Sequence, residues 1–322
     1  LEFRRVLFRS GFFYVKASNF TPFIPPSQPA STVEGSSAVT GVMTQPLWQF
    51  ATGMTPSVYG VPGILSGAAL VFFAFIGFDV VATASEETKN PHKNVPLGIG
   101  VGMLLIIVMY MLVAVVTTGM VSYADLAKQD SPSLATAFEL VGADWAAKII
   151  SFGIVLGLAT VVMVLLLGLT RIVFAMSRDG LLPRGLSKTG KHGTPAALQI
   201  VVGAVVALVA AFFDIGVLSD MVNISTLSAF TLVAISIPIM RKKRPDLPRA
   251  FKMPGSPWIP ILIAVANFWL MLNLSVLTWI RFVVWLVVGF AIYFGYGYWH
   301  ARLGKGDLTE TLSAETDKAV NG

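Results

Sequence analysis

The residues that could do chemistry in this sequence lie in one short stretch, where a glycine and a carboxylate interrupt an apolar run. The stretch 72–81 reads FFAFIGFDVV and places Gly77 two residues before Asp79. Glycine weakens a helix, and a carboxylate at membrane depth must be neutralised or paired. The pattern therefore predicts a broken membrane helix that presents free N–H and C=O groups to a ligand. A simple kink, with Asp79 near the membrane surface, is the alternative.

Two further carboxylates, Glu86 and Glu87, lie at the end of the same segment, close to Lys89. Charge pairs at a membrane exit can form and separate as helices move, so these residues are candidates for an inner gate. Solvated charges at a helix end are the equally simple alternative. Asp79 is the only carboxylate that we expect at membrane depth.

Other chemistry is not indicated. The chain has no cysteine and only three histidines, which are too scattered for a metal site. We find no nucleophile paired with a base. The glycines of GIGVG (98–102) come after no strand and precede no P-loop lysine, which argues against nucleotide binding. We expect neither an enzyme nor a cofactor.

Composition places the chain in the membrane. Hydrophobic residues make up 55% of the 322 residues and charged residues only 12%, whereas soluble domains carry roughly 25% charged residues. The mean hydropathy is +0.75. The net charge of +6 comes from short basic clusters between apolar segments, as in cytoplasmic loops. This distribution argues against nucleic-acid binding and predicts an all-α, multi-spanning membrane protein in contact with a lipid bilayer.

Seven apolar segments approach the roughly 20 residues that span a bilayer. They cover about 63–85, 97–121, 147–174, 196–213, 217–240, 258–277 and 279–300. Between the second and third, Asp130-Ser131-Pro132 predicts an N-cap and an early proline. Phe138 then lies on the apolar face of a short amphipathic helix, for which plain packing is the simplest role.

The basic residues set an orientation. Alternate loops and the C-terminal tail hold most of the Lys and Arg residues, including the RKKR cluster at 241–244. By the positive-inside rule these loops are cytoplasmic. The broken segment therefore enters from outside, and the C-terminus lies inside.

The sequence also suggests four regions. Residues 1–10 (LEFRRVLFRS) fit poorly with the rest of the chain and read as a non-native leader. Residues 11–62 read as the end of a membrane helix and a polar extracellular loop. Residues 63–301 form the transmembrane domain, and residues 302–322 a disordered cytoplasmic tail.

Several motifs carry a resemblance that covers nearly all of residues 11–303. They are FFAFIGFDVVATASEETKNPHKNVPLGI (72–99), RIVFAMSRDGLLP (171–183), VNISTLSAF (222–230) and RKKRPDLPRAFKMPG (241–255). With these, the chain resembles the amino acid–polyamine–organocation (APC) superfamily of amino acid permeases, specifically its cationic amino acid transporter-like branch.

The resemblance implies a LeuT-like fold of twelve helices, built from two inverted five-helix repeats, with the first and sixth helices broken. This chain corresponds to helices 6 to 12 and is expected to be inactive without helices 1 to 5. In such permeases the carbonyls before the second break face the substrate ammonium. That role falls on Phe73, Ala74, Phe75, Ile76 and Gly77, with Phe73 as an aromatic gate. From the residues alone, phenylalanines that face lipid or core are the simpler interpretation.

The resemblance also suggests a coupling role for Asp79. Some antiporters of the superfamily have a pH-sensitive glutamate there, and a poorly hydrated carboxylate favours its protonated form. Capping the N-terminus of the second half-helix is the other role for Asp79. The expected partners are an amino acid, cationic or neutral, and in a proton-coupled mechanism protons as well.

Sodium coupling is not expected. Sodium-coupled carriers of this fold use hydroxyl and carbonyl oxygens from helices 1 and 8. In the helix 8 stretch 157–169, the Thr160 hydroxyl is the only side-chain oxygen. The whole protein is thus expected to be a sodium-independent amino acid permease of the cytoplasmic membrane. A non-transporting amino acid sensor on the same scaffold is the alternative.

Overall fold

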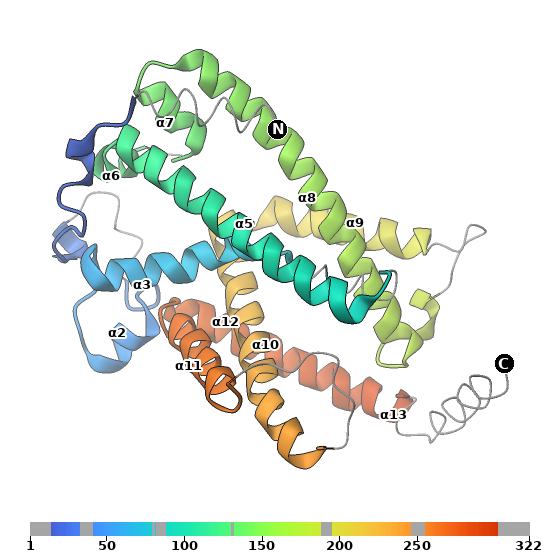
Figure 1. Cartoon of the computed structure of the whole chain (residues 1–322). Coiled ribbons are helices and arrows are strands. Elements are labelled where there is room, and N and C mark those ends of the chain that lie inside the picture. The colour runs from blue at the N-terminus through green and yellow to red at the C-terminus, as the bar shows by residue number, and fades with distance from the viewer. Residues whose placement is uncertain are drawn as a thin grey trace. The chain divides into compact units, whose positions relative to one another are not determined.

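A computed structural model describes residues 14–32, 41–78, 81, 88–129, 132–187, 195–245 and 255–301 (Figure 1). The predicted leader (1–10) and tail (302–322) lie outside these residues. So do Asp79, Glu86 and Glu87. Most of the described chain is helical, as the sequence predicts.

Before the first long helix the chain forms short elements. They are the 3-10 helices η2 (Ala17–Phe20) and η3 (Ala30–Thr32), strand β1 (Gln28–Pro29), helix α2 (Leu47–Thr52) and strand β2 (Ser57–Val58). The two strands pair antiparallel. The segment of η2 is fixed to the end of the second long helix, where Lys16 N–H and Asn19 Nδ2 both donate to the Gly119 carbonyl at 2.8 Å.

Each of the seven predicted apolar segments contains a helix. They are α3 (Gly60–Val71) with the 3-10 helix η5 (Phe72–Phe75), α5 (Pro91–Met120), α8 (Asp144–Arg178), α9 (Ala196–Phe212), α10 (Ile215–Lys243), α11 (Trp258–Leu272) and α12 (Val276–Ile292). A π-helix, η8 (Tyr293–Gly297), and α13 (Tyr298–His300) continue α12. Short helices α6 (Tyr123–Ala127), α7 (Leu134–Leu140) and η7 (Arg184–Ser187) connect the long ones.

Four of these helices are long and apolar enough to cross a membrane. They are the spans Lys93–Met120, Asp144–Arg178, Ile215–Lys243 and Val276–His300. The other three apolar helices, Gly60–Phe75, Ala196–Phe212 and Trp258–Leu272, are shorter. At 1.5 Å per residue, a 15-residue helix such as α11 covers only about 23 Å. The expectation of seven full-length spans is therefore confirmed for four of the described helices.

The predicted span 258–277 ends early because of Asn273. Helix α11 stops at Leu272, and Asn273 is its C-cap. The Asn273 side chain donates to the Trp269 carbonyl at 2.8 Å and accepts from Trp48 Nε1 at 3.0 Å. These bonds fix a turn that apolar periodicity does not reveal.

The described chain divides into two compact units. One contains the described residues among 1–160 and 219–279, and the other those among 161–218 and 280–322. In the second unit, the turn after α8 is closed by a bond of 2.7 Å from Ser177 Oγ to the Pro183 carbonyl. In the same unit, the His300 ring stacks on the Tyr296 ring, with the ring centroids 4.2 Å apart.

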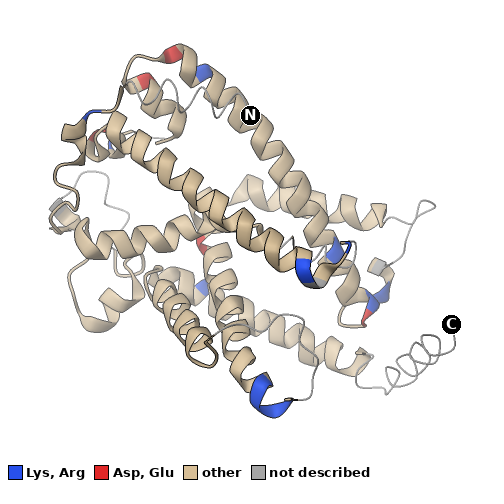
Figure 2. Ribbon diagram, viewed as in Figure 1, with Lys and Arg blue, Asp and Glu red and all other residues tan. Residues whose placement is uncertain are grey.

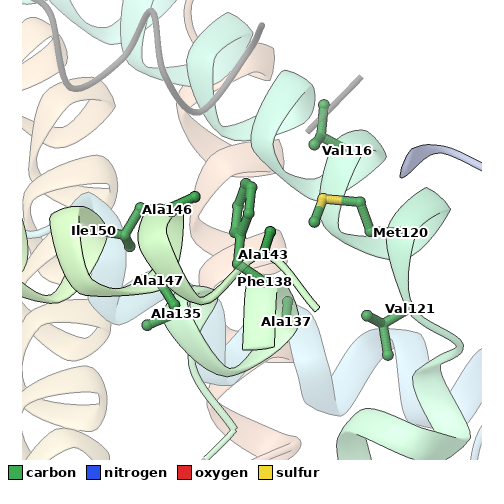
Figure 3. Close-up of a cluster of buried hydrophobic side chains, with 10 residues drawn as sticks. All are labelled: Val116, Met120, Val121, Ala135, Ala137, Phe138, Ala143, Ala146, Ala147 and Ile150. Atoms are coloured by element: carbon green, nitrogen blue, oxygen red, sulfur yellow. The ribbon is translucent and has the colours of Figure 1, made fainter. Parts of the chain in front are cut away.

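The first unit has a buried core around Phe138. Side chains from α5, α7 and α8 meet there (Figure 3): Val116, Met120, Val121, Ala135, Ala137, Phe138, Ala143, Ala146, Ala147 and Ile150. Five of the ten are alanines, which let α7 and α8 approach closely around one large ring. This is the packing role expected for Phe138.

The start of α7 differs from the prediction. Its N-cap is Ser133, whose Oγ accepts from Thr136 N–H at 3.1 Å. Asp130 and Ser131, the predicted caps, lie outside the described residues. Ser133 comes directly after Pro132, so the cap is one residue after the proline rather than before it.

Basic residues lie mainly at helix ends (Figure 2). The last turn of α10 carries Arg241, Lys242 and Lys243, and α8 ends at Arg178. Arg178 forms an ion pair with Asp179 at 3.5 Å, and both side chains are exposed. Charges at the ends of apolar helices are typical of membrane spans.

The Phe138 core yields a prediction about stability. Phe138 is fully buried, whereas Phe152 on α8 is 68% exposed. Phe138→Ala should lower the free energy of unfolding by about 3–5 kcal/mol, because it opens a cavity among small residues. Phe152→Ala, the matched control, should change it little. Thermal unfolding of the detergent-purified chain, followed by tryptophan fluorescence, measures both. Equal shifts in the two variants would contradict the assignment of this core.

Candidate functional site

The first apolar helix is interrupted where the sequence predicts a break. Helix α3 gives way to the 3-10 helix η5, and Ile76 is extended, with φ −65° and ψ 136°. Gly77 comes next with φ 124°, and Phe78 is again helical. Two consecutive residues thus leave helical geometry inside an apolar segment.

Gly77 is required by its backbone conformation rather than by crowding. A Cβ built on Gly77 meets nothing within 4 Å, but its φ of 124° is one that L side chains rarely adopt. Glycine adopts such angles without steric cost. The break therefore depends on a backbone angle that almost any other residue would strain.

The break changes how nearby carbonyls are bonded. The Phe73 carbonyl accepts from Ile76 N–H at 3.2 Å, a 3-10 type bond. The Ala74 carbonyl accepts instead from a side chain, the Tyr110 hydroxyl of α5, at 2.8 Å. Backbone at membrane depth needs such partners, because lipid offers none.

Aromatic rings pack on both sides of the break. Phe75 meets the Tyr110 ring edge-on, with centroids 5.2 Å apart. The Phe230 ring of α10 packs against Phe72 before the break and Phe78 after it. The ring centroids are 6.2 Å and 5.3 Å apart, respectively. One side chain of α10 thus bridges the interruption.

A buried amide of α10 contacts α3 two residues before η5 begins. Asn223 of α10 is completely buried, and its Nδ2 donates to the Leu70 carbonyl over a long 3.4 Å. Its Oδ1 has no hydrogen-bond partner within the described part of the chain. Such groups are rare in native structures because burial without a partner costs free energy. The Asn223 side chain thus links α10 to α3 at the approach to the break by one long bond and keeps its oxygen unsatisfied within the described residues.

The predicted site residues have different surroundings. Phe73, the proposed gate, is 43% exposed, and its ring makes no aromatic contact with any described residue. Phe75, Ile76 and Gly77 are half-buried, while Ala74 is exposed. The other predicted site residues, Asp79, Glu86 and Glu87, are not among the residues that the structure describes.

The sequence reasoning missed three residues that surround the break: Tyr110, Asn223 and Phe230. Two of them belong to the VNISTLSAF motif, in which Asn223 is the polar residue with the deepest burial. Tyr110 carries a hydroxyl well inside the apolar span Lys93–Met120. A polar group inside such a span was the signal available in the sequence for Asn223 and Tyr110.

A hollow lies at the other end of α3, away from the break. It measures about 610 Å³ and is lined by residues that include Tyr59, Ser66, Thr118 and Asp220. Asp220 accepts from the Thr278 hydroxyl at 3.1 Å. Asp220 itself lies within the apolar span Ile215–Lys243. The expectation that Asp79 is the only carboxylate within the spans is therefore wrong.

The break offers hydrogen-bond acceptors without formal charge. The described residues in contact with it are aliphatic, aromatic or neutral and polar. Backbone carbonyls accept N–H donors and, unlike a carboxylate, need no counterion in lipid. Such a site suits a ligand that carries an ammonium group. No group of three or more His, Asp or Glu gathers among the described residues.

The chain matches the family model described as "Amino acid permease" over residues 7–297. It is 47% identical over 247 residues to the branched-chain amino acid permease BcaP of Bacillus subtilis, covering 76% of this chain and 53% of that protein. It is 38% identical over 296 residues to the methylthioribose transporter of Bacillus subtilis, covering 92% of this chain and 57% of that protein.

A plant relative matches a shorter stretch. The Arabidopsis thaliana protein named cationic amino acid transporter 3, mitochondrial, is 44% identical over 195 residues, covering 60% of this chain and 31% of that protein. The chain spans about half the length of the two bacterial relatives and a third of the plant one.

The conformation of Gly77 yields a second prediction. Gly77→Ala should destabilise the purified chain by about 1–3 kcal/mol, because the new Cβ strains the backbone at φ 124°. Gly100→Ala is the matched control, since a Cβ there also meets nothing within 4 Å but lies in the regular helix α5. It should leave stability unchanged or raise it by up to about 1 kcal/mol. Thermal unfolding in detergent distinguishes the two, and equal effects would show that the angle at Gly77 is not required.

Proposed function

Because this chain belongs to the amino acid permease family, we propose that the whole protein moves amino acids across a membrane by alternating access, as a secondary transporter or exchanger. The observation that carries the proposal is the break at Ile76 and Gly77, which puts neutral carbonyl acceptors inside an apolar helix. Amino acids share an ammonium group that such acceptors bind.

The chain supplies the second part of a longer permease in this proposal. Support comes from the relatives, of which it covers 53% and 57%. The part that it supplies corresponds to helices 6 to 12 of a twelve-helix, inverted-repeat fold. The first broken helix, which would bind the substrate carboxylate, belongs to the other part.

The substrate that we propose is a neutral amino acid with an apolar side chain. The side chains around the described part of the break are mostly aromatic and carry no formal charge, so none of them offers a counter-charge to a cationic side chain; they include Phe72, Phe73, Phe75, Phe78, Tyr110, Asn223 and Phe230. The relative that is 47% identical is named a branched-chain amino acid permease. Lysine and arginine are the alternative, because other relatives are named cationic amino acid transporters.

Transport is proposed to be independent of sodium. In the stretch 157–169 of α8 the Thr160 hydroxyl is the only side-chain oxygen, and it donates to the Gly157 carbonyl at 2.7 Å. A hard cation needs several oxygen ligands at close range. Protons are the candidate coupling ion, with Asp79 as the carboxylate that could carry them, and Glu86 and Glu87 as inner-gate charges. The C-terminus is proposed to be cytoplasmic, since the basic clusters obey the positive-inside rule.

Uptake by the full-length protein tests the function. Liposomes that contain it should accumulate labelled leucine saturably, and excess unlabelled leucine, isoleucine or valine should compete. Liposomes with only this chain are the matched control and should show no saturable uptake, because half of the proposed site is missing. If only lysine or only methylthioribose competed with labelled leucine, while isoleucine and valine did not, the proposed substrate would be refuted. Binding of leucine without uptake by the full-length protein would favour a sensor instead.

Ion replacement tests the coupling. In the same liposomes, sodium is replaced by choline at constant pH and ionic strength. The initial rate of leucine uptake in choline should stay within about twofold of the rate in sodium, because the stretch 157–169 of α8 offers only the Thr160 hydroxyl among its side chains, and a sodium site needs several oxygens. A rate that then rises with external acidification would support proton coupling. Loss of most uptake in choline would contradict sodium independence.

A further inference from the structure

The exposed side of α10 ends in a pair of lysines. We propose that this side binds an anionic phospholipid from the leaflet in which α10 ends. The acyl chains lie along its aliphatic residues, and the phosphate meets Lys242 and Lys243. The inference goes beyond the proposed function, because lipid binding requires only that the protein lies in a membrane.

The spacing of exposed residues defines a stripe along α10. Its members follow one another at intervals of three or four residues, so they lie on one side of the helix: Leu232, Ile235, Ile239 and Lys243. All four are exposed, Leu232 to 68%. Ala234 points to the opposite side of α10 and is only 5% exposed. One side of α10 therefore packs against protein, and the stripe is left for a partner.

The stripe has the length of one lipid leaflet. Leu232 and Lys243 are eleven positions apart in α10, which at 1.5 Å per residue is about 17 Å. Half of the roughly 30 Å hydrocarbon core of a bilayer is about 15 Å. An acyl chain that follows the stripe thus starts near the bilayer midplane and brings its headgroup to the level of the lysines.

The polar residue beside the stripe needs no partner from another element. Ser236 is exposed, but its hydroxyl donates to the Val233 carbonyl at 2.7 Å, within its own helix. A hydroxyl that is bonded in this way can face hydrocarbon without the cost of an unpaired polar group. Lipid is the occupant that such a surface suits.

The charge at the end of the stripe is available to an anion. The last turn of α10 is basic (Figure 2), and neither Lys242 nor Lys243 forms an ion pair with any residue that the structure describes. The end of α8 differs, because Arg178 lies 3.5 Å from Asp179. A lysine stem can lie along apolar surface while its ammonium reaches the headgroups. The helix dipole also favours cations here, but it does not require an aliphatic stripe before them.

Binding of labelled phosphatidylglycerol tests the inference. The full-length protein in neutral detergent is mixed with fluorescent phosphatidylglycerol or, separately, with phosphatidylcholine that carries the same chains and label. The wild type should bind phosphatidylglycerol about 10- to 30-fold more tightly, as expected for two cations at about fivefold each. The double variant Lys242→Gln, Lys243→Gln should bind the two lipids within about threefold of each other. Lys242→Arg with Lys243→Arg should keep the preference, because it keeps both charges.

Arg178→Gln is the matched control. It also removes an exposed positive charge from the end of an apolar helix, but one that Asp179 already balances. It should leave the preference for phosphatidylglycerol unchanged. Glycerol phosphate, which is the headgroup without acyl chains, should not displace the bound lipid at the same concentration.

Each outcome decides the inference. Equal binding of the two lipids by the wild type would overturn it, and so would an equal loss of preference in Arg178→Gln, which would show attraction to net charge only. Displacement by glycerol phosphate would show a site for free phosphate and overturn the lipid assignment. Binding of neither lipid would show that the stripe is covered by protein, from the rest of the permease or from a second copy. The assay needs no transport, so a wild type that takes up no leucine refutes the proposed function alone.

Discussion

Lipid offers no hydrogen bonds to the backbone, and this constraint governs the structure around residue 77. Each polar backbone group that a broken helix releases must find a partner in protein or line a cavity. The Ala74 carbonyl finds one in the Tyr110 hydroxyl at 2.8 Å. Side chains of α5 and α10 thus reach the interrupted segment: Tyr110 of α5 bonds Ala74, and Asn223 of α10 bonds Leu70 just before the break.

The aromatic contacts serve the same constraint in a different way. An interruption separates two helix segments that could otherwise move independently. Phe230 contacts a ring on each side, Phe72 and Phe78, and so keeps α10 in register with both. Edge-on and tilted ring pairs contribute about 0.5–1.5 kcal/mol each beyond their buried area. These ring contacts therefore link α10 to the residues immediately before and after the break.

The sequence predicted the break because glycine and a carboxylate are conspicuous inside an apolar run. It also predicted the helical class and the family, which depend on composition and motif order. It did not predict where α11 ends, because Asn273 acts through Trp48, a residue distant in sequence. It missed Tyr110 for the same reason: one hydroxyl in a long span gains meaning only when Ala74 lies opposite. Ser133 was overlooked as a cap because Asp130 and Ser131 fit the local pattern equally well.

The chemistry of the break also bears on selectivity. A carboxylate in an apolar cavity would attract any cation, and its charge would require neutralisation whenever the site is empty. Carbonyls held by neutral groups such as the Tyr110 hydroxyl avoid that requirement, because a carbonyl is a directional acceptor with no net charge. Such acceptors can recognise an ammonium group but cannot distinguish what is attached to it. In a site of this kind, discrimination among substrates must fall on the surrounding side chains, and around the described break these are mainly aromatic rings, joined by the Tyr110 hydroxyl and the Asn223 amide.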